Sequence, residues 1–317
     1  MQQILWKREC REMERYIEMS DGHFVFTRTL QPSSTCIGHI HILHGMAEHS
    51  GRYIKFASAL TTAGYAVTMH DHRGHGETAG YNGTLGFFAE QNGFDRVVED
   101  VHEVVTALHE QFADVPFILF GHSMGSFITR RYIQLYSHHV DRVILCGTGH
   151  VTTLHAMGNM VSRALAKQLG KETESKLLNK LSFGSFNKQF PNSKTAYDWL
   201  CSVENEVQKY IDDPYCGFIP TNQFFVDLTT GFMTLNRKNE IAKVRKDLPI
   251  LLISGSKDPV GDQGQGIYAV AEQFAVAGLQ NVTVYLFEDK RHEILNEDNQ
   301  EAVYQVLLRW LEKNDTR

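Results

Sequence analysis

Gly121-His122-Ser123-Met124-Gly125 is the stretch of this chain that decides its fold. The apolar run Phe117-Ile118-Leu119-Phe120 precedes it, and a helix-compatible stretch follows it. A serine between two glycines in a strand–turn–helix context is typical of a nucleophile elbow, which raises the serine hydroxyl above the carboxyl end of a sheet. Gly121 and Gly125 leave room for the sharp turn, where neighbouring chains approach closely. The pentapeptide also occurs by chance in unrelated chains, so its meaning depends on the residues around it.

Candidate partners of Ser123 lie downstream in the order acid, then histidine. Asp258 follows the apolar run 249–253 and His292 follows the next strand candidate, so both are expected where strands end at the carboxyl edge of a sheet. A serine hydroxyl needs an imidazole to remove its proton, and a buried carboxylate keeps that imidazole in one tautomer. We therefore predict that these three residues form a catalytic triad. Asp227 is the main alternative acid, but it lies in a stretch with helical periodicity rather than after a strand.

A second group of residues is predicted to stabilise negative charge on a substrate. His44-Gly45-Met46 follows the apolar strand candidate 40–43. In this kind of fold, one N–H from the loop after that strand and one from the residue after the nucleophile form an oxyanion hole. We therefore predict that the backbone N–H groups of Met46 and Met124 hold the oxyanion. Each such donor contributes about 3 kcal/mol to transition-state stabilisation.

Apolar runs of strand length alternate with helical periodicity along much of the chain. Strands that are apolar throughout are covered on both faces, so this alternation indicates an α/β fold with a mostly parallel central sheet and helices on both sides. The predicted strands are 23–27, 38–43, 66–69, 116–120, 142–146, 250–254 and 282–287. The predicted helices are 53–63, 94–112, 125–136, 264–277 and 300–312.

A long stretch without strand signals follows the strand candidate 142–146, and much of it has helical periodicity. We predict an inserted helical cap at 150–225, and a core formed by 1–149 and 226–317. Apolar residues at helical spacing define one face of the cap: Leu154, Met157, Val161, Leu165 and Leu169.

Two interpretations of this apolar face remain open. The simpler one is an amphipathic helix packed on the core. The other is a lid, in which Leu154 and Met157 line an acyl tunnel and the basic side of the helix makes transient contact with a membrane surface that contains anionic lipid.

Composition excludes several classes of protein. The net charge of -6 leaves no basic surplus to neutralise phosphates, so nucleic acid is not an expected partner. The five cysteines have no paired spacing, which predicts reduced thiols and a cytoplasmic location. The segment 1–15 lacks the apolar core of a signal peptide, and no apolar run has the length of a membrane span. Nothing in the sequence specifies an oligomeric state.

Two polar patterns allow more than one interpretation. Five histidines at 39, 41, 70, 72 and 75 resemble a metal site, but no acidic or thiol ligand has supporting spacing, so neither a metal nor another cofactor is predicted. Glu48 and Arg52 have i, i+4 spacing, which suits a surface ion pair. The spacing alone leaves their role open.

The chain resembles the monoacylglycerol lipase and lysophospholipase branch of the α/β-hydrolases, also described as serine aminopeptidase S33-like. The segments that carry the resemblance are 44–53, 71–76, 121–125, 255–260 and 291–297, and they extend along nearly the whole chain. The segment 212–218 resembles bacterial members in particular. The resemblance implies an α/β-hydrolase fold and places Glu48 and Arg52 near the leaving group of a glycerol ester.

The predicted function is that of a serine hydrolase without a cofactor. It would cleave carboxylic esters of single-chain lipids, monoacylglycerols or lysophospholipids, through an acyl-enzyme. One alternative is an aminopeptidase, which needs a carboxylate in the cap for the substrate ammonium; the candidates are Glu204, Glu206, Asp212 and Asp213. Another is a binding protein that has lost catalysis, whose usual sign is a missing triad residue, and none is missing here.

Overall fold

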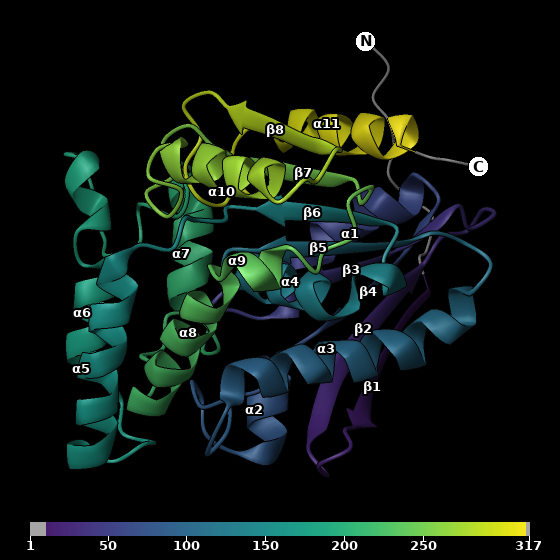
Figure 1. Ribbon diagram of the computed structural model, residues 1–317. Coiled ribbons are helices and arrows are strands. Elements are labelled where there is room, and N and C mark those ends of the chain that lie inside the picture. Colours follow the sequence, from purple (N-terminus) through teal and green to yellow (C-terminus); the bar gives the residue numbers. More distant parts are fainter. Residues whose placement is uncertain (1–10, 315–317) are drawn as a thin grey trace.

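The computed structural model describes residues 11–314, and its centre is one eight-stranded sheet (Figure 1). Cys10 and most of the segment 1–15 lie outside these residues. The strand order is β1-β2-β4-β3-β5-β6-β7-β8; β1, β2 and β4 pair antiparallel, and all other neighbours are parallel. The mostly parallel sheet that the sequence predicts is confirmed. The strands are β1 (Arg11–Glu18), β2 (Phe24–Gln31), β3 (Gly38–Leu43), β4 (Tyr65–His70), β5 (Phe117–His122), β6 (Arg142–Cys146), β7 (Ile250–Gly255) and β8 (Val282–Phe287).

Each predicted strand corresponds to one of β2 to β8, whereas β1 was not predicted. β1 pairs with β2 along its whole length, from Arg11 opposite Gln31 to Glu18 opposite Phe24. It is an edge strand, and most of its described side chains are exposed. A strand that buries so little carries no apolar alternation, which is why its sequence gave no strand signal.

Helices cover both faces of the sheet, and every predicted helix is confirmed. Successive residues of a strand face opposite ways. In β6, Val143 and Leu145 join a buried cluster with α3, α4, α8 and α10, while Ile144 and Cys146 join a cluster with α1 and α11. The helices are α1 (Ile54–Thr62), α2 (Gly76–Asn82), α3 (Gly93–His109), α4 (Met124–Tyr136), α5 (Thr153–Leu169), α6 (Lys176–Phe183), α7 (Glu204–Asp212), α8 (Asn222–Leu235), α9 (Lys238–Ile241), α10 (Gln265–Val276) and α11 (Gln300–Lys313), with 3-10 turns η1 (Ser50–Tyr53), η2 (Glu110–Phe112), η3 (Ser137–His139) and η4 (Phe186–Gln189).

The segment between β6 and β7 contains α5 to α9. α5 and α6 stand beyond the carboxyl ends of the parallel strands, at the left of Figure 1. The predicted boundary between residues 225 and 226 falls inside α8, which packs on α5 and also on α3 and α4. The division into a core and a cap therefore stays a prediction. None of the helices in residues 11–314 is long and apolar enough to cross a membrane.

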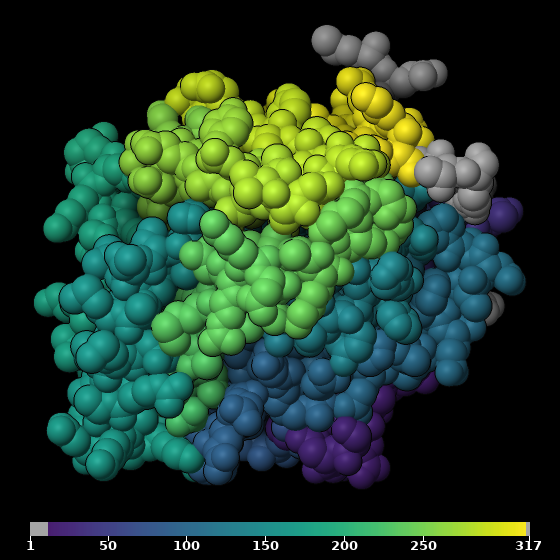
Figure 2. Space-filling view, in the orientation of Figure 1, coloured from purple at the N-terminus to yellow at the C-terminus, as the bar shows by residue number. Residues whose placement is uncertain are grey.

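Helix α5 corrects one expectation. Leu154 and Met157 are 70% and 62% exposed, so most of the apolar face of this helix does not pack on the core; Leu165 alone of the five predicted residues packs against the main buried cluster. The helix instead buries Asn159 and Ser162, and the Asn159 amide donates hydrogen bonds to the hydroxyls of Thr229 and Thr230 in α8. Because α8 presents Thr229 and Thr230 at this contact, polar residues of α5 are buried against it. Figure 2 shows the teal segment that contains α5 at the left edge of the molecule.

Candidate active site

Ser123 lies at the turn between β5 and α4. Its φ of 50° and ψ of -117° are strained for a residue with a side chain, and such strain is concentrated at functional sites. A side chain on Gly121 would collide with the carbonyl of Gly125, and one on Gly125 would collide with the carbonyl of Leu43. The two flanking glycines are therefore required by packing, as the sequence pattern predicts.

His292 and Asp258 are in contact at the same end of the sheet. Nδ1 of His292 lies 2.9 Å from both carboxylate oxygens of Asp258, and both residues are buried. The carboxylate also accepts hydrogen bonds from the Ser254 hydroxyl at 2.7 Å and from the Val260 N–H at 2.9 Å. Asp258 is thus fully oriented, and it keeps the His292 proton on Nδ1, with Nε2 left as a base.

Burial and pairing act against each other in this pair. Burial lowers the pKa of His292, but the charge and hydrogen bond of Asp258 outweigh it and leave this pKa above its ordinary value. Burial likewise raises the pKa of Asp258, and the hydrogen-bonded His292 brings it below the usual range. Asp258 is therefore ionised at neutral pH, and His292 is stabilised when it takes up a proton.

Ser123 and His292 line one cavity of about 170 Å³, together with Met46. Within residues 11–314, the Ser123 hydroxyl makes no hydrogen bond to His292. In enzymes without bound substrate this contact is often long and tightens when substrate binds. The cavity therefore brings the predicted nucleophile and base to the same space, and Asp258 lies behind the base.

The loop that carries Met46 is held from several sides. The Gly45 N–H donates to Glu48 Oε1 at 2.5 Å, and Nδ1 of His44 donates to the Gly45 carbonyl at 2.7 Å. This carbonyl and the Met46 N–H belong to one peptide unit and point in opposite directions, so the His44 bond also orients the N–H. Met124 is the first residue of α4, where backbone N–H groups have no partner within the helix.

Glu48 and Arg52 belong to a buried network rather than to the surface. Arg52 lies 2.6 Å from carboxylate oxygens of both Glu48 and Glu293, and the Tyr53 hydroxyl donates to Glu48 at 2.7 Å. Glu48 is only 3% exposed, so the interpretation as a surface ion pair is wrong. Burial raises the pKa of Glu48, but Arg52 outweighs it and lowers this pKa to about 2. Glu48 and Glu293 line the cavity, while Arg52 lies behind them.

The residues on the cap side of the cavity differ from those predicted. Leu154 and Met157 do not line it; Phe183, Trp199 and Phe218 do. The Trp199 ring lies 5.2 Å from the His292 ring, between centroids. Sequence reasoning missed these aromatic residues and Glu293, although Glu293 directly follows His292 and aromatic residues are dense between 183 and 199.

The other candidate groups lie elsewhere. Asp227 lies in α8, accepts a hydrogen bond from the Gly93 N–H at 3.1 Å, and lines a different cavity. The acid beside His292 is therefore Asp258. Among the carboxylates proposed for an aminopeptidase, Glu204, Glu206, Asp212 and Asp213, none lines the cavity of Ser123.

The histidine cluster forms a hydrogen-bonded chain through the sheet. Thr68 Oγ1 links His39 Nε2 at 2.6 Å to His41 Nδ1 at 2.7 Å, and His41 continues to His70 at 2.8 Å and His70 to His72 at 2.9 Å. Burial lowers the pKa of each of these rings, so they are neutral. The chain ends at His72, whose Nε2 has no hydrogen-bond partner within residues 11–314; His75 lies outside the chain and its Nδ1 donates to the Arg73 carbonyl at 2.9 Å.

Comparison with known proteins extends over nearly the whole chain. Residues 35–299 match the family described as "Serine aminopeptidase, S33". The monoglyceride lipase of Rattus norvegicus is 27% identical over 290 residues, which cover 91% of this chain and 86% of that enzyme. The monoacylglycerol lipase of Mycolicibacterium smegmatis is 26% identical over 285 residues, or 88% of this chain and 90% of that enzyme.

Solved structures resemble the chain equally broadly. A thermostable carboxyl esterase from Bacillus coagulans, in complex with glycerol, superposes with a TM-score of 0.89 at 27% identity, covering 95% of this chain and 98% of that one. A lipase in an open form superposes with a TM-score of 0.85 at 28% identity, covering 97% of this chain and 100% of that one.

Proposed function

The chain belongs to the serine aminopeptidase S33 family, it has the α/β-hydrolase fold, and we propose that it hydrolyses carboxylic esters of single-chain lipids. The observation that carries this proposal is the cavity shared by Ser123 and His292, with Asp258 bound to the far nitrogen of the imidazole. Monoglyceride lipases among the relatives, and esterases among the similar structures, support the same class of reaction.

The proposed mechanism is acyl transfer in two halves. His292 Nε2 takes the Ser123 proton as the hydroxyl attacks the ester carbonyl, and the Met46 and Met124 N–H groups hold the resulting oxyanion. His292 then protonates the leaving alcohol. Water attacks the acyl-enzyme by the reverse proton transfers, releases the fatty acid and restores Ser123.

The walls of the cavity divide by chemistry, which supports an ester of a polar alcohol. Glu48 and Glu293 form a polar side, where the hydroxyls of a glycerol-like leaving group find acceptors. Phe183, Trp199 and Phe218 form an aromatic side that suits one acyl chain. Monoacylglycerol is the favoured substrate, and a lysophospholipid is the second candidate within the same class.

The outer face of α5 supports transient contact with a lipid surface. Met157, Met160 and Val161 are 62%, 73% and 40% exposed. Arg163, one turn after Met160, donates hydrogen bonds to Asn159 and Thr230 at the contact with α8, and Lys167 follows one turn later. An apolar stripe flanked by basic residues binds the interface of anionic membranes. We expect vesicle binding that weakens with salt and with Met160→Asp, and unchanged turnover of a water-soluble ester by this variant.

A cytoplasmic location belongs to the same proposal. Cys36, Cys146, Cys201 and Cys216 are free thiols. Thiols that stay unpaired suit a reducing compartment. Fractionation of the native cell tests this, and recovery outside the cytoplasm would contradict it.

The decisive experiment combines a covalent probe with a substrate panel. A fluorophosphonate should label Ser123, and labelling should disappear in Ser123→Ala while the protein stays folded. Monoacylglycerols should be cleaved well and di- and triacylglycerols poorly. Clear cleavage of amino-acid anilides together with inactivity on acyl esters would favour the aminopeptidase, and an unlabelled protein would favour a binding function.

A further inference from the structure

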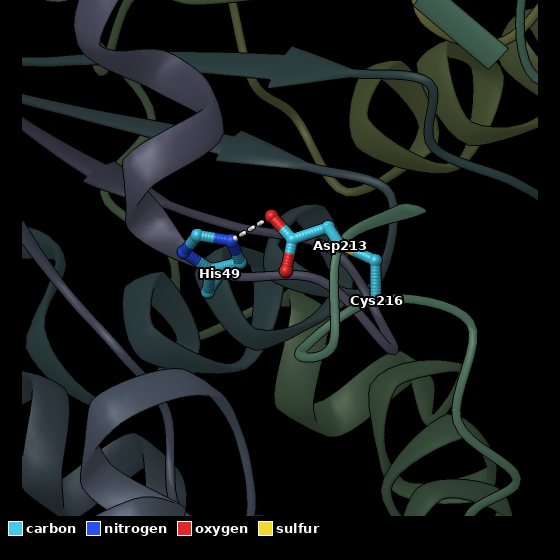
Figure 3. Close-up of side chains that lie close together, drawn as sticks. All are labelled: His49, Asp213 and Cys216. Carbon is cyan, nitrogen blue, oxygen red and sulfur yellow. Dashed lines mark hydrogen bonds and ion pairs between the residues drawn. The ribbon is translucent and has the colours of Figure 1, made fainter. Parts of the chain in front are cut away.

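His49, Asp213 and Cys216 meet outside the catalytic cavity (Figure 3). His49 ends the loop that carries Met46 and is the N-cap of η1, whereas Asp213 and Cys216 follow α7. One potential ligand atom from each side chain lies within 4.8 Å of the other two. Two segments far apart in sequence thus present a nitrogen, an oxygen and a sulfur to one point.

Hydrogen bonds within the turn after α7 orient the Asp213 carboxylate. The Cys216 N–H donates to the Asp213 carbonyl at 3.0 Å, which closes the turn. The Tyr215 N–H donates to Asp213 Oδ1 at 2.9 Å, so Oδ2 is left to accept the Nε2–H of His49 at 2.9 Å. A carboxylate that is oriented by a second hydrogen bond is typical of metal ligands. Ligand atoms of a tetrahedral zinc site lie roughly 3.2–3.8 Å apart, so small movements bring these three into position.

The ligand types select the ion. Imidazole, carboxylate and thiolate together are the ligands of Zn²⁺, whereas Mg²⁺ and Ca²⁺ prefer oxygen alone. Arg52 is the cation that acts on both Asp213 and Cys216, and its charge is matched by its ion pairs with Glu48 and Glu293. The surroundings therefore do not repel a divalent ion.

Two features oppose binding and set its strength. Burial raises the pKa of the Cys216 thiol, which must lose its proton to bind the ion, and the His49 ring is already hydrogen-bonded. Nδ1 of His49 accepts the Gly51 N–H at 3.2 Å, so the ring proton is on Nε2. A metal bound at Nε2 requires the ring proton of His49 to move to Nδ1. The protonated Nδ1 can no longer accept the Gly51 N–H, so the hydrogen bond between them is lost. The cost makes the site weaker than a structural zinc site, and it couples occupancy to the loop that contains His49.

We propose that His49, Asp213 and Cys216 form a regulatory Zn²⁺ site. Zn²⁺ bonds to the Cys216 sulfur, and the thiol proton is released to solvent. Zn²⁺ also bonds to His49 Nε2, which loses its proton while Nδ1 gains one, so that the ring stays neutral. Asp213 binds as the carboxylate and one water completes four ligands, so one proton is released per ion. Because His49 ends the loop that carries Met46, occupancy shifts this loop and slows turnover.

Direct binding to the full-length protein is the test. Co²⁺ serves as a coloured probe, with Zn²⁺ as competitor. We expect one Co²⁺ per chain, a cobalt–thiolate charge-transfer absorption, displacement by Zn²⁺ and no binding of Mg²⁺. His49→Gln keeps an N–H donor for Asp213 but lacks the imidazole, and should weaken binding about tenfold or more. Cys216→Ala should abolish the thiolate absorption.

Matched controls separate this site from other thiols and histidines. Cys36→Ser and His138→Gln should bind Co²⁺ like the unmodified protein. Absence of binding, unchanged affinity in His49→Gln, or loss of binding in Cys36→Ser would overturn the proposal. Zn²⁺ should also slow ester hydrolysis, and His49→Gln should resist this inhibition. The binding measurement uses no substrate, so its failure is distinct from a failure of the proposed esterase function.

Discussion

Two buried charge networks lie at the catalytic cavity, the Asp258–His292 pair and the Glu48–Arg52–Glu293 group. In both networks the carboxylates are buried. In the pair, the positive partner exists only when His292 takes up a proton, whereas Arg52 is charged at every pH at which the protein folds. The Asp258–His292 pair can therefore gain and lose a proton during a reaction, whereas the Glu48–Arg52–Glu293 group keeps a constant charge. We assign proton transfer to the first network and support of the cavity walls to the second.

The largest effect should come from breaking the first network. Ser123→Ala, His292→Ala and Asp258→Asn should each lower kcat about 10⁴-fold or more, because the three residues act as a unit. Steady-state kinetics with a monoacylglycerol and a thermal melt check activity and folding together. Ser123→Ala/His292→Ala should be little worse than either single variant. Near-additive losses would mean that the residues do not share one mechanism.

Breaking the second network should cost stability before activity. Arg52→Met leaves Glu48 and Glu293 buried without a counter-charge and should lower the free energy of unfolding by about 3–5 kcal/mol. Urea denaturation measures this loss. Adding Glu48→Gln and Glu293→Gln should recover part of it, because the unpaired charges are removed. A variant Arg52→Met as stable as the parent would show that the network carries no net charge interaction.

The pH dependence should separate the two networks. His292 must be neutral to accept the Ser123 proton and its pKa is raised, so kcat/KM should fall up to tenfold per pH unit below a midpoint above 6.5. The ion pair of protonated His292 with Asp258 stabilises the folded protein fully below pH 6.5, the ordinary pKa of histidine. This stabilisation is lost as the pH rises through the raised pKa of His292. Glu48, with a pKa of about 2, stabilises the fold above about 4.5 and loses this effect only as pH falls toward 2. A midpoint below 6 in kcat/KM would contradict the assigned role of Asp258.

The smallest effect should distinguish the aromatic wall from the outer helix. Trp199→Ala enlarges the cavity and should change the relative kcat/KM for short and long acyl chains several-fold. Met157→Ala should leave the profile unchanged for water-soluble esters, because Met157 is exposed and outside the cavity. A chain-length series of nitrophenyl esters measures both variants. The opposite result, a shift in Met157→Ala alone, would place α5 over the acyl chain.

The predictions from sequence succeeded where local pattern and chemistry coincide. Ser123 lies in a strained turn whose glycines are needed by close backbone contacts, and such a turn leaves a readable pentapeptide. Asp258 and His292 lie in the loops that follow β7 and β8, two strands with mainly apolar sequences. In contrast, β1 is an exposed edge strand that pairs with β2 through backbone hydrogen bonds, ion pairs of Glu12 and Glu14 with Arg28, and the Tyr16–Phe26 ring contact. These contacts leave no apolar alternation in its sequence.

Helix α5 explains why other predictions failed. Its helical periodicity was correct, but periodicity identifies an apolar face without saying what that face meets. The threonines of α8 hold the polar side of α5 instead, and they come from a segment about seventy residues away. For the same reason the cavity is lined by Trp199 and Phe183, whose neighbours are set by packing at a distance.

The sequence by itself determined the parallel sheet, the nucleophile turn and the order of the acid and the histidine, because these depend on local conformation and on chemistry that few residues perform. Only the tertiary structure decided that Glu48 is paired with Glu293 through Arg52, that α5 exposes its apolar side, and that His49 meets Asp213 and Cys216. Each of these depends on contacts between distant segments, and the energy of a contact depends on its partner rather than on the residue alone.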